Sequence, residues 1–371
     1  MRMMTEEKLV PKLRFSGFED EWKEVKLGEI STFLDNKRVP LKEDDRKHMQ
    51  GKYPYYGASG IIDYVNDYIF DEELILMGED GANIVTRSSR LIFLAKGKYW
   101  VNNHAHVIKA NKDINQYFLS ESLEKINYEK YNTGTAQPKL NREVCQKIKV
   151  IIPKFDEQNK IANFLSNLDK KIELLEQNHL KYQNFKKYLM QQIFAQKLRF
   201  DFDIVKLKDV SKINKGKQLN KDDMLENGEF YVLNGGQEPS GYTNSWNTPE
   251  NTITISEGGN SCGFVNFNEE KFWSGGHCYY LNNLSEKIDT YYLYSYLKFI
   301  EPHIMRLRVG SGLPNIQKGD IENIKIKIAP NNEQKQISNL LLSTDQKISS
   351  IKNQKECFEI FKKSLLQQMF V

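Results

Sequence analysis

Several features that would assign the 371-residue chain to a class at once are missing from it. Its four cysteines contain no Cys-x-x-Cys pair, so they cannot form a zinc cluster on their own and read as reduced thiols. No apolar run approaches the roughly 18 residues that a membrane-spanning helix requires. The N-terminus has charges where a signal peptide has an apolar core. We therefore expect a cytoplasmic protein with no membrane partner.

Catalytic motifs are missing as well. There is no GxxxxGK(S/T) loop, which argues against ATP hydrolysis. The glycine loop and the Asn/Asp-Pro-Pro-aromatic tetrapeptide of a DNA methyltransferase do not occur. His104 and His106 have no acidic or thiol neighbour in the sequence that would complete a metal site, so we interpret His104 and its counterpart His277 as packing or polar-network residues. The sequence predicts no catalytic residue, no metal site and no cofactor in this chain.

Composition leaves the partner open. The net charge is +4 and the pI is about 8.5, which permits binding to nucleic acid without demanding it. The length suggests two domains and an additional element, and a hydrophobic content of 39% is ordinary for chains with buried cores.

The most informative feature is an internal duplication. A shift of 176 residues superimposes 155–194 on 331–370 without a gap. In this alignment 15 of the 40 positions are identical, whereas chance gives roughly two or three. Upstream, Gly78–Asn83 resembles Ser256–Ser261. The order along the chain is therefore globular unit, helix, globular unit, helix.

Each globular unit has mixed patterning. Short runs such as Glu73–Met77 and Thr252–Ile255 read as strands between Gly- and Asn-rich turns. The segments 115–127 and 289–300 instead have the helical spacing of apolar residues. We predict α+β units of roughly 130–150 residues, each long enough for its own core.

A long helix follows each unit. Apolar residues at alternating spacings of four and three, the pattern of a heptad seam, begin at Ile161 and again at Ile337, although Lys362 and a few other polar residues interrupt the pattern. Pro153 and Pro330 stand just ahead, where proline suits a helix start. The residues predicted for the spacer helices and their partner contacts are Glu157, Gln158, Ile161, Leu165, Leu168, Ile172, Leu175, Leu189, Glu333, Gln334, Ile337, Leu341, Ile348, Ile351 and Leu365.

The two seams are expected to pair with each other. Each helix would be ~60 Å long, which exceeds the size of one unit, and no long return loop is available, so only an antiparallel pairing closes. The sequence thus predicts an α+β fold with two pseudo-symmetric domains joined by an antiparallel coiled coil. The predicted segments are 1–153, 154–196, 197–329 and 330–371. The alternative is that each helix packs only on its own domain.

Two similar heads at a set separation are suited to measure duplex DNA. Sequence readout needs side chains such as Arg, Lys, Asn, Gln and Ser that reach base edges. The most specific candidates are the loops 131–141 and 308–318, which both place small residues before a proline, followed by a cation or amide and an aliphatic residue. Solvated loops or tight turns are the alternative interpretation. The candidate DNA contacts are Lys37, Arg38, Tyr56, Ser59, Asn83, Arg87, Thr133, Thr135, Gln137, Lys139, Asn234, Gln237, Asn260, Ser261, Arg308, Ser311, Asn315, Gln317 and Lys318.

This pattern resembles the specificity subunit of type I restriction–modification systems over essentially the whole chain. The resemblance is carried by the repeated Glu-Gln helix starts, the repeated Phe-Lys-Lys…Leu-x-Gln-Gln-x-Phe helix ends, and the segments Lys12–Phe15 and Trp22–Ile30. One departure is that the link from Gln196 to Asp203 lacks the longer stretch seen at Phe15–Trp22, so the second unit is expected to start differently.

The resemblance implies two target-recognition domains, each reading one half of a bipartite, asymmetric site in double-stranded DNA. It implies that the helices set the gap between the halves and carry two methyltransferase subunits, which restriction subunits then join. S-adenosylmethionine, ATP and magnesium would belong to those partner subunits, and this chain would be non-catalytic.

Two other hypotheses are kept. The first is a non-enzymatic, two-headed adaptor that binds protein or glycan. The second, which the missing motifs disfavour, is a self-sufficient nuclease. The bases recognised, the gap length, the adenines that are methylated, the presence of a restriction subunit, and the split between base and phosphate contacts do not follow from the sequence.

Overall fold

The computed structural model describes residues 9–134, 136–195, 202–310, 312 and 314–371. The chain forms two compact units. Unit 1 comprises the described residues of Met1–Leu174 and Lys355–Val371, and unit 2 comprises those of Leu175–Gln354. Each unit includes parts of both long helices, so unit 1 is not contiguous in sequence, and the linear boundaries given above stay a prediction.

Unit 1 holds three sheets, of strand order β1-β10, β2-β9-β6-β7 and β4-β3-β8-β5. Its strands are β1 (Lys23–Lys26), β2 (Ser31–Phe33), β3 (Gln50–Gly57), β4 (Gly60–Val65), β5 (Phe70–Asp71), β6 (Leu74–Gly78), β7 (Ile92–Ala95), β8 (Lys98–Val101), β9 (Ala105–Ala110) and β10 (Lys149–Ile152). Its shorter helices are α1 (Leu27–Ile30), η1 (Asp35–Lys37), α2 (Glu43–His48), α3 (Asn83–Thr86), α4 (Gln116–Glu124), η2 (Glu129–Tyr131) and α5 (Arg142–Gln146).

Unit 2 holds sheets of order β11-β19, β12-β18-β15-β16 and β14-β13-β17. Its strands are β11 (Asp203–Lys206), β12 (Lys212–Lys215), β13 (Phe230–Leu233), β14 (Gly241–Thr243), β15 (Thr252–Ser256), β16 (Val265–Asn268), β17 (Trp273–Ser274), β18 (Cys278–Asn282) and β19 (Lys325–Ile328). Its shorter helices are α7 (Leu207–Val210), η3 (Lys221–Asp223), α8 (Thr290–Phe299), α9 (Glu301–Ile304), η4 (Met305–Leu307) and α10 (Lys318–Glu322).

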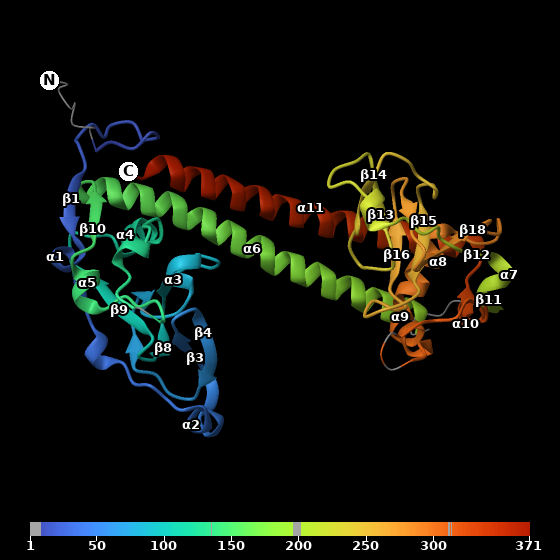
Figure 1. The fold of residues 1–371 in the computed structure, drawn as a ribbon, viewed down its shortest axis with the longest axis horizontal. Helices are drawn as coiled ribbons and strands as arrows, with labels where there is room; N and C mark the ends of the chain where they lie inside the picture. Colours follow the sequence, from blue (N-terminus) through green and yellow to red (C-terminus); the bar gives the residue numbers. More distant parts are fainter. Residues whose placement is uncertain (1–8, 135, 196–201, 311, 313) are drawn as a thin grey trace. The chain divides into compact units, whose positions relative to one another are not determined.

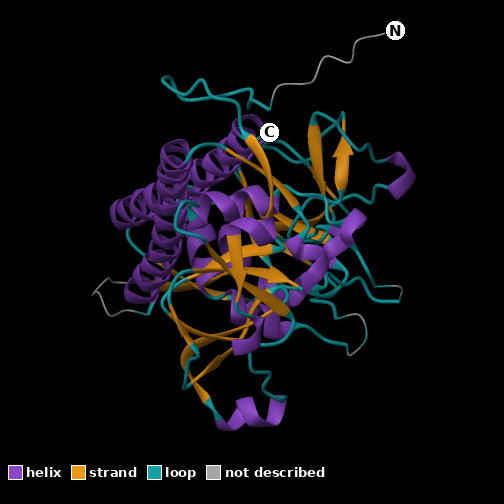
Figure 2. Ribbon diagram, turned by 90° about the vertical axis from the view of Figure 1, so that its left-hand side faces the viewer, coloured by secondary structure: helices purple, strands orange, loops and turns teal. Residues whose placement is uncertain are grey.

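The central sheets of the two units have the same topology. In unit 1, β6 lies between β7 and β9, and in unit 2, β15 lies between β16 and β18, with all pairs antiparallel. The register is also the same, because Met77 faces His106 across the unit 1 pair and Ile255 faces Tyr279 across the unit 2 pair. Strands and helices are interleaved throughout (Figure 2), so the predicted α+β class is confirmed.

The predicted strands and helices form for the expected reasons. The runs at β6 and β15 are buried along their whole length, as suits central strands rich in Leu, Ile and Thr. The predicted helices at 115–127 and 289–300 are α4 and α8, and their N-caps Asn115 and Asp289 accept hydrogen bonds from backbone amides three residues on. The side chains under these elements form one large apolar core in each unit.

The two long helices are α6 (Phe155–Phe194, 40 residues) and α11 (Asn331–Met369, 39 residues), each starting within two residues of the predicted proline. Their repeated glutamines are buried inside the units. Gln158 accepts from the Asn115 amide at 2.9 Å and donates to the Pro153 carbonyl at 2.9 Å. Gln334 accepts from the Asp289 amide at 2.8 Å and donates to the Ala329 carbonyl at 2.8 Å. The glutamines therefore fix each helix to the cap of α4 or α8.

The glutamates beside them differ in their contacts. Glu157 is buried and forms two hydrogen bonds with the Arg14 guanidinium, of 2.7 and 2.8 Å. Glu333 is half-buried, and its Oε2 atom has no hydrogen-bond partner within the described part of the chain. The residues Lys197–Phe200, which correspond to Lys12–Phe15, lie outside the described residues.

The helices pair in an antiparallel manner within each unit. In unit 1, Ile161 and Leu165 near the start of α6 share a buried cluster with Leu365 and Met369 near the end of α11, and these helix ends lie side by side in Figure 1. In unit 2, Ile337 and Leu341 share the core with Met190 and Ile193. The predicted apolar seam residues are all buried or half-buried: Ile161, Leu165, Leu168, Ile172, Leu175, Leu189, Ile337, Leu341, Ile348, Ile351 and Leu365. The coiled-coil prediction is therefore confirmed.

A repeated ion pair links the helices in both units. In unit 1, Lys362 of α11 contacts Asp169 of α6 at 2.6 Å, and Tyr117 donates to the same carboxylate. In unit 2, Lys186 of α6 contacts Asp345 of α11 at 2.6 Å, and a tyrosine of α8, Tyr291, again donates to the carboxylate. Lys186 and Lys362 thus form cross-helix contacts. They favour one register because a slipped pairing would leave part-buried charges unpaired.

An aromatic cluster surrounds the end of one long helix in each unit. In unit 1, Trp22 packs edge-on against both Phe118 and Phe370. In unit 2, Tyr292 and Phe194, which correspond to Phe118 and Phe370, also pack against each other. The segment 196–201 before β11 lies outside the described residues.

Candidate nucleic-acid interface

Four segments of unit 1 meet at the end of β6, where Glu79 directly follows the strand. Arg38, after η1, contacts Glu79 at 2.6 Å and also donates to the carbonyls of Asn103 and Ala105. The turn between β3 and β4 approaches Gly78 so closely that a Cβ there would lie 2.7 Å from the Ala58 carbonyl oxygen. The loop 131–141 completes the group, because Lys139 contacts Glu79 at 3.2 Å. Segments predicted separately from the sequence therefore form one site.

Backbone hydrogen bonds fix the 131–141 loop. The loop closes on itself because the Thr133 amide donates to the Lys139 carbonyl at 2.8 Å. It is tied to the end of β6 by two further bonds, from Gly81 N to Pro138 O at 3.0 Å and from Leu140 N to Glu79 O at 2.8 Å.

Unit 2 repeats these bonds residue for residue. Val309 N donates to Asn315 O at 2.9 Å, Gly259 N to Pro314 O at 3.0 Å, and Ile316 N to Glu257 O at 2.9 Å. Gly81 and Gly259 both have a positive φ, of 110° and 72°, which glycine adopts without the strain that other residues would incur. The proline-containing loops are therefore equivalent in structure as well as in sequence.

Other segments of unit 2 converge on the buried carboxylate of Glu257. Lys215 at the end of β12 contacts it at 2.7 Å. The turn after β13 reaches the site because the Ser256 hydroxyl donates to the Gly235 carbonyl and the His277 amide donates to Asn234.

Ten of the predicted DNA contacts are exposed at these two sites. We define the unit 1 recognition surface as Lys37, Ser59, Thr133, Gln137 and Lys139. We define the unit 2 recognition surface as Gln237, Asn260, Arg308, Gln317 and Lys318. Each surface contains cationic side chains for phosphate contacts and amide or hydroxyl side chains that can read base edges.

The remaining predicted contacts of unit 1 are half-buried and hold the protein itself together. Tyr56 stacks on Phe93, and Asn83 accepts from the Ser89 amide and donates to the Arg90 carbonyl. Arg87 donates to both the carbonyl and the carboxylate of Glu124, each at 2.7 Å. Arg38 is occupied by Glu79 as described. The structure shows these four residues in contacts within the protein. That they also contact DNA stays a prediction.

In unit 2 the half-buried candidates are Asn234, Ser261 and Asn315. The Oδ1 atom of Asn315 is buried without a hydrogen-bond partner within the described part of the chain, so this side chain is not satisfied by the protein alone. Thr135 and Ser311 lie outside the described residues.

A charged network that sequence reasoning missed lies beneath the unit 1 loop. His106 of β9 is buried, with Nδ1 2.8 Å from Asp35 and Nε2 2.7 Å from the Leu140 carbonyl. Both partners are acceptors, so both ring nitrogens carry protons and the side chain is an imidazolium. Burial would lower the pKa of His106, but the hydrogen bond to Asp35 and the negative charge of that carboxylate raise the pKa to about 10.

The carboxylates of this network remain ionised. Burial raises the pKa values of Asp35 and Glu79, but hydrogen bonds from His106 and Arg38 respectively, with the nearby positive charges, bring both pKa values below their ordinary range. The internal repeat contains one hint of this network, because its alignment places Glu79 on Glu257, so that both units have an acidic residue at this position.

His104 and His277, which we interpreted as packing or polar-network residues, are exposed, and each lies near an acidic side chain. His104 contacts Asp80 at 2.8 Å, and His277 lies 3.6 Å from Glu257. Within the described residues, no group of three His, Cys, Asp or Glu side chains is arranged to hold a metal ion. No helix of the described chain combines the length and apolar character needed to cross a membrane.

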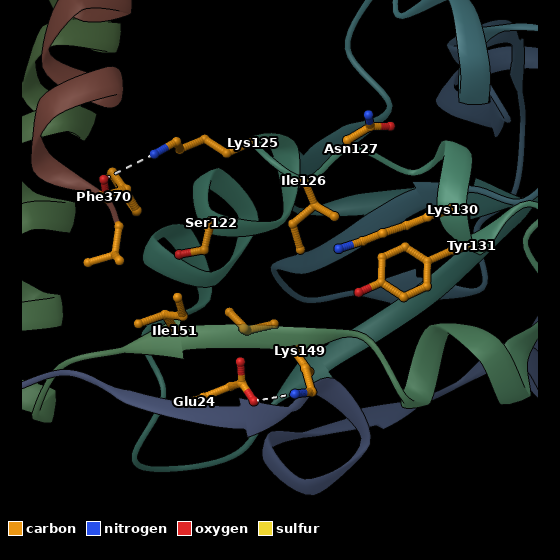
Figure 3. Close-up of a pocket in the computed structure, with 12 residues that line it drawn as sticks. Glu24, Ser122, Lys125, Ile126, Asn127, Lys130, Tyr131, Lys149, Ile151 and Phe370 are labelled. Carbon is orange, nitrogen blue, oxygen red and sulfur yellow. Dashed lines mark hydrogen bonds and ion pairs between the residues drawn. The ribbon is translucent and has the colours of Figure 1, made fainter. Parts of the chain in front are cut away.

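A separate pocket of about 310 Å³ in unit 1 lies beside the end of α4 and β10 (Figure 3). Lys125 and Lys149 line it, but Lys125 donates to the Phe370 carbonyl and Lys149 pairs with Glu24 at 2.6 Å. Among the described residues, none of the predicted DNA contacts lines this pocket.

Comparison with known proteins finds the same two-part organisation along the chain. The family model described as the type I restriction modification DNA specificity domain matches the chain twice, at residues 19–181 and 200–358. The chain is 27% identical to a Haemophilus influenzae protein named as a type I restriction enzyme specificity subunit, over 88% of this chain and 87% of that one. It is 25% identical to the MjaVIII specificity subunit of Methanocaldococcus jannaschii, over 94% and 91% respectively.

Among solved structures, the fold is similar to that of the S subunit of a type I restriction-modification system from M. genitalium. The TM-score is 0.77 at 18% identity, covering 98% of this chain and 99% of that one. The two matches to the DNA specificity domain, at residues 19–181 and 200–358, together cover more than half of the chain. The chain belongs to the family of type I restriction–modification specificity subunits.

Proposed function

We propose that this specificity subunit reads a bipartite, asymmetric site in double-stranded DNA, one half with each recognition surface. The observation that carries the proposal is that the two units share a backbone scaffold but expose different side chains on it. The equivalent positions 133 and 309 are exposed in both units and hold Thr and Val. Positions 139 and 315 hold an exposed Lys and a half-buried Asn. Different donors and acceptors on the same frame would select different bases, so the two half-sites would differ.

We propose further that the chain is non-catalytic and acts in the cytoplasm with two methyltransferase subunits and with restriction subunits. S-adenosylmethionine, ATP and magnesium would be bound by those partners. Support for two equivalent partner contacts comes from the helices. Phe185 and Phe361, which are equivalent in the repeat, are 46% and 47% exposed, and each precedes two lysines. Exposed phenylalanines at both copies favour the same partner contact made twice.

The test is co-expression of the chain with its methyltransferase subunit, followed by sequencing of modified bases in the cellular DNA. The expected result is methylation at a single two-part sequence with a fixed gap. Methylation at random sites, or at a sequence without two halves, would refute the proposal. In a binding assay we expect affinity to fall steeply with salt concentration, whereas a protein- or glycan-binding adaptor would show no such dependence.

A further inference from the structure

We call the loops 131–141 and 308–318 the recognition loops of unit 1 and unit 2. They share their backbone hydrogen bonds, but different buried side chains support them. The register of the central sheets makes His106 and Tyr279 equivalent, since each faces the same position of the neighbouring strand. By the same register, Asp35 of unit 1 corresponds to Lys215 of unit 2. The chemistry beneath the loop therefore changes from a cation between two acceptors to a neutral phenol beside a lysine.

In unit 1 the anchor is strong. His106 donates one proton to Asp35 and the other to the Leu140 carbonyl, directly after Lys139 of the recognition surface. The same carboxylate accepts from the Val107 amide at 2.9 Å, which fixes the pair to β9. A charged donor in a buried site makes a stronger bond than a neutral one.

In unit 2 the anchor is weak. The Tyr279 hydroxyl has a single proton, and its two acceptors are the Glu257 carboxylate at 3.0 Å and the Ile316 carbonyl at 3.4 Å. The proton goes to the closer, charged acceptor. The Ile316 carbonyl, which corresponds to that of Leu140, is left with a poor partner.

We propose that His106 is the positioning residue of the unit 1 recognition loop, which it holds through the Leu140 carbonyl, and that Tyr279 fills the same place with a weaker hold in unit 2. His106 does not face DNA, because only 1% of its surface is exposed. It acts through the loop that presents Gln137 and Lys139. The inference rests on the proposed function and adds that base selection in the first half-site depends on a buried residue more strongly than selection in the second.

The test uses the full chain co-expressed with its methyltransferase subunit and reads the base preference at every position of both half-sites. We expect H106A to reduce discrimination in one half-site by about tenfold while the other half stays as in the wild type, because a mispositioned loop forfeits roughly one good base contact. H106Q, whose amide nitrogen can still donate to the Leu140 carbonyl, is expected to restore most of the loss. Y279F is expected to change the other half-site by less than about threefold.

Two controls separate positioning from stability. V65A removes buried apolar atoms in unit 1, next to Tyr55 and Trp100 and away from the loop anchor, so it is expected to lower total methylation without changing the preferred bases. If H106A does not fold, the double variant D35N/H106A repeats the test without an unpaired buried carboxylate. Unchanged preference in a folded H106A or D35N/H106A variant, equal relaxation of both halves, or the same pattern in V65A would overturn the inference. A wild-type chain that directs no two-part methylation would instead refute the proposed function.

Discussion

Unit 1 and unit 2 are two solutions to the same structural problem. In both, three backbone hydrogen bonds close the recognition loop and tie it to a strand end that carries a glutamate, half-buried in unit 1 and buried in unit 2. Below the loop they differ, because unit 1 uses an imidazolium–carboxylate pair and unit 2 uses a tyrosine and a lysine. The comparison shows that main-chain hydrogen bonds define the shape of the loop in both units. The exposed side chains and the supporting side chains differ between the units.

The largest expected effect is on the stability of each unit, and it shows whether the long helices stabilise both units equally. Leu165 and Leu341 are equivalent in the repeat and fully buried, one in each unit. L165A and L341A are each expected to destabilise their own unit by about 2–5 kcal/mol, because truncation leaves a cavity in a packed core. Hydrogen exchange resolved by unit measures the loss. A cost below about 1 kcal/mol in either unit would mean that the seam is not a core there.

The cross-helix ion pairs are expected to respond unequally. D345A leaves Lys186 without its carboxylate and should destabilise unit 2 by about 3 kcal/mol. D169A should cost roughly half as much, because Lys362 also lies 3.4 Å from Glu121 and keeps one acidic neighbour. Thermal unfolding of the two variants gives the comparison, and a larger loss for D169A would contradict it.

The pH dependence should separate the two half-sites. Folding raises the pKa of His106 from 6.5 to about 10, so its stabilising effect is complete below about pH 6.5 and is lost as the pH rises through about 10. Burial raises the pKa of Tyr279 above its ordinary value, so that group stays protonated over this range. We expect base discrimination by unit 1 to weaken between about pH 7 and pH 10 while that of unit 2 holds. Methylation assays on mismatched DNA across this range measure it, and loss in unit 2 alone would be the opposite result.

The smallest effect concerns phosphate contacts. K139A and K318A are each expected to lower DNA affinity for all sequences alike and to reduce the salt-dependence slope by about 0.9, as the loss of one phosphate contact does. K112A, at an exposed lysine beyond the other end of β9, serves as the matched control and should leave the slope unchanged. A change of sequence preference in K139A would show that this lysine reads a base.

The overall fold was predictable because the sequence contains an internal repeat. The 176-residue repeat located both long helices and made 137–140 and 313–316 equivalent, and heptad spacing identified the buried seam residues. The supporting network was not predictable. Asp35 and His106 are 71 positions apart, and only the register of β2 against β9 brings them together. The shared glutamates were visible as an aligned pair, but nothing in the sequence distinguished buried acids from solvated ones.

The same limit explains the candidate contacts. Arg87 looked like a DNA-facing cation, yet it binds Glu124, a residue 37 positions away whose approach depends on how α4 packs. Residue type alone did not show which candidate side chains are exposed and which are held by contacts within the protein.

The division of labour between the units is tested most directly by two variants, Q137A and Q317A. Each removes one exposed amide, from the unit 1 and the unit 2 recognition surface respectively. Base-resolved maps of methylated DNA from cells that express each variant with the methyltransferase subunit should show relaxed preference in one half-site for Q137A and in the other half-site for Q317A. If both variants relax the same half, or if neither alters the map, the units do not read separate halves.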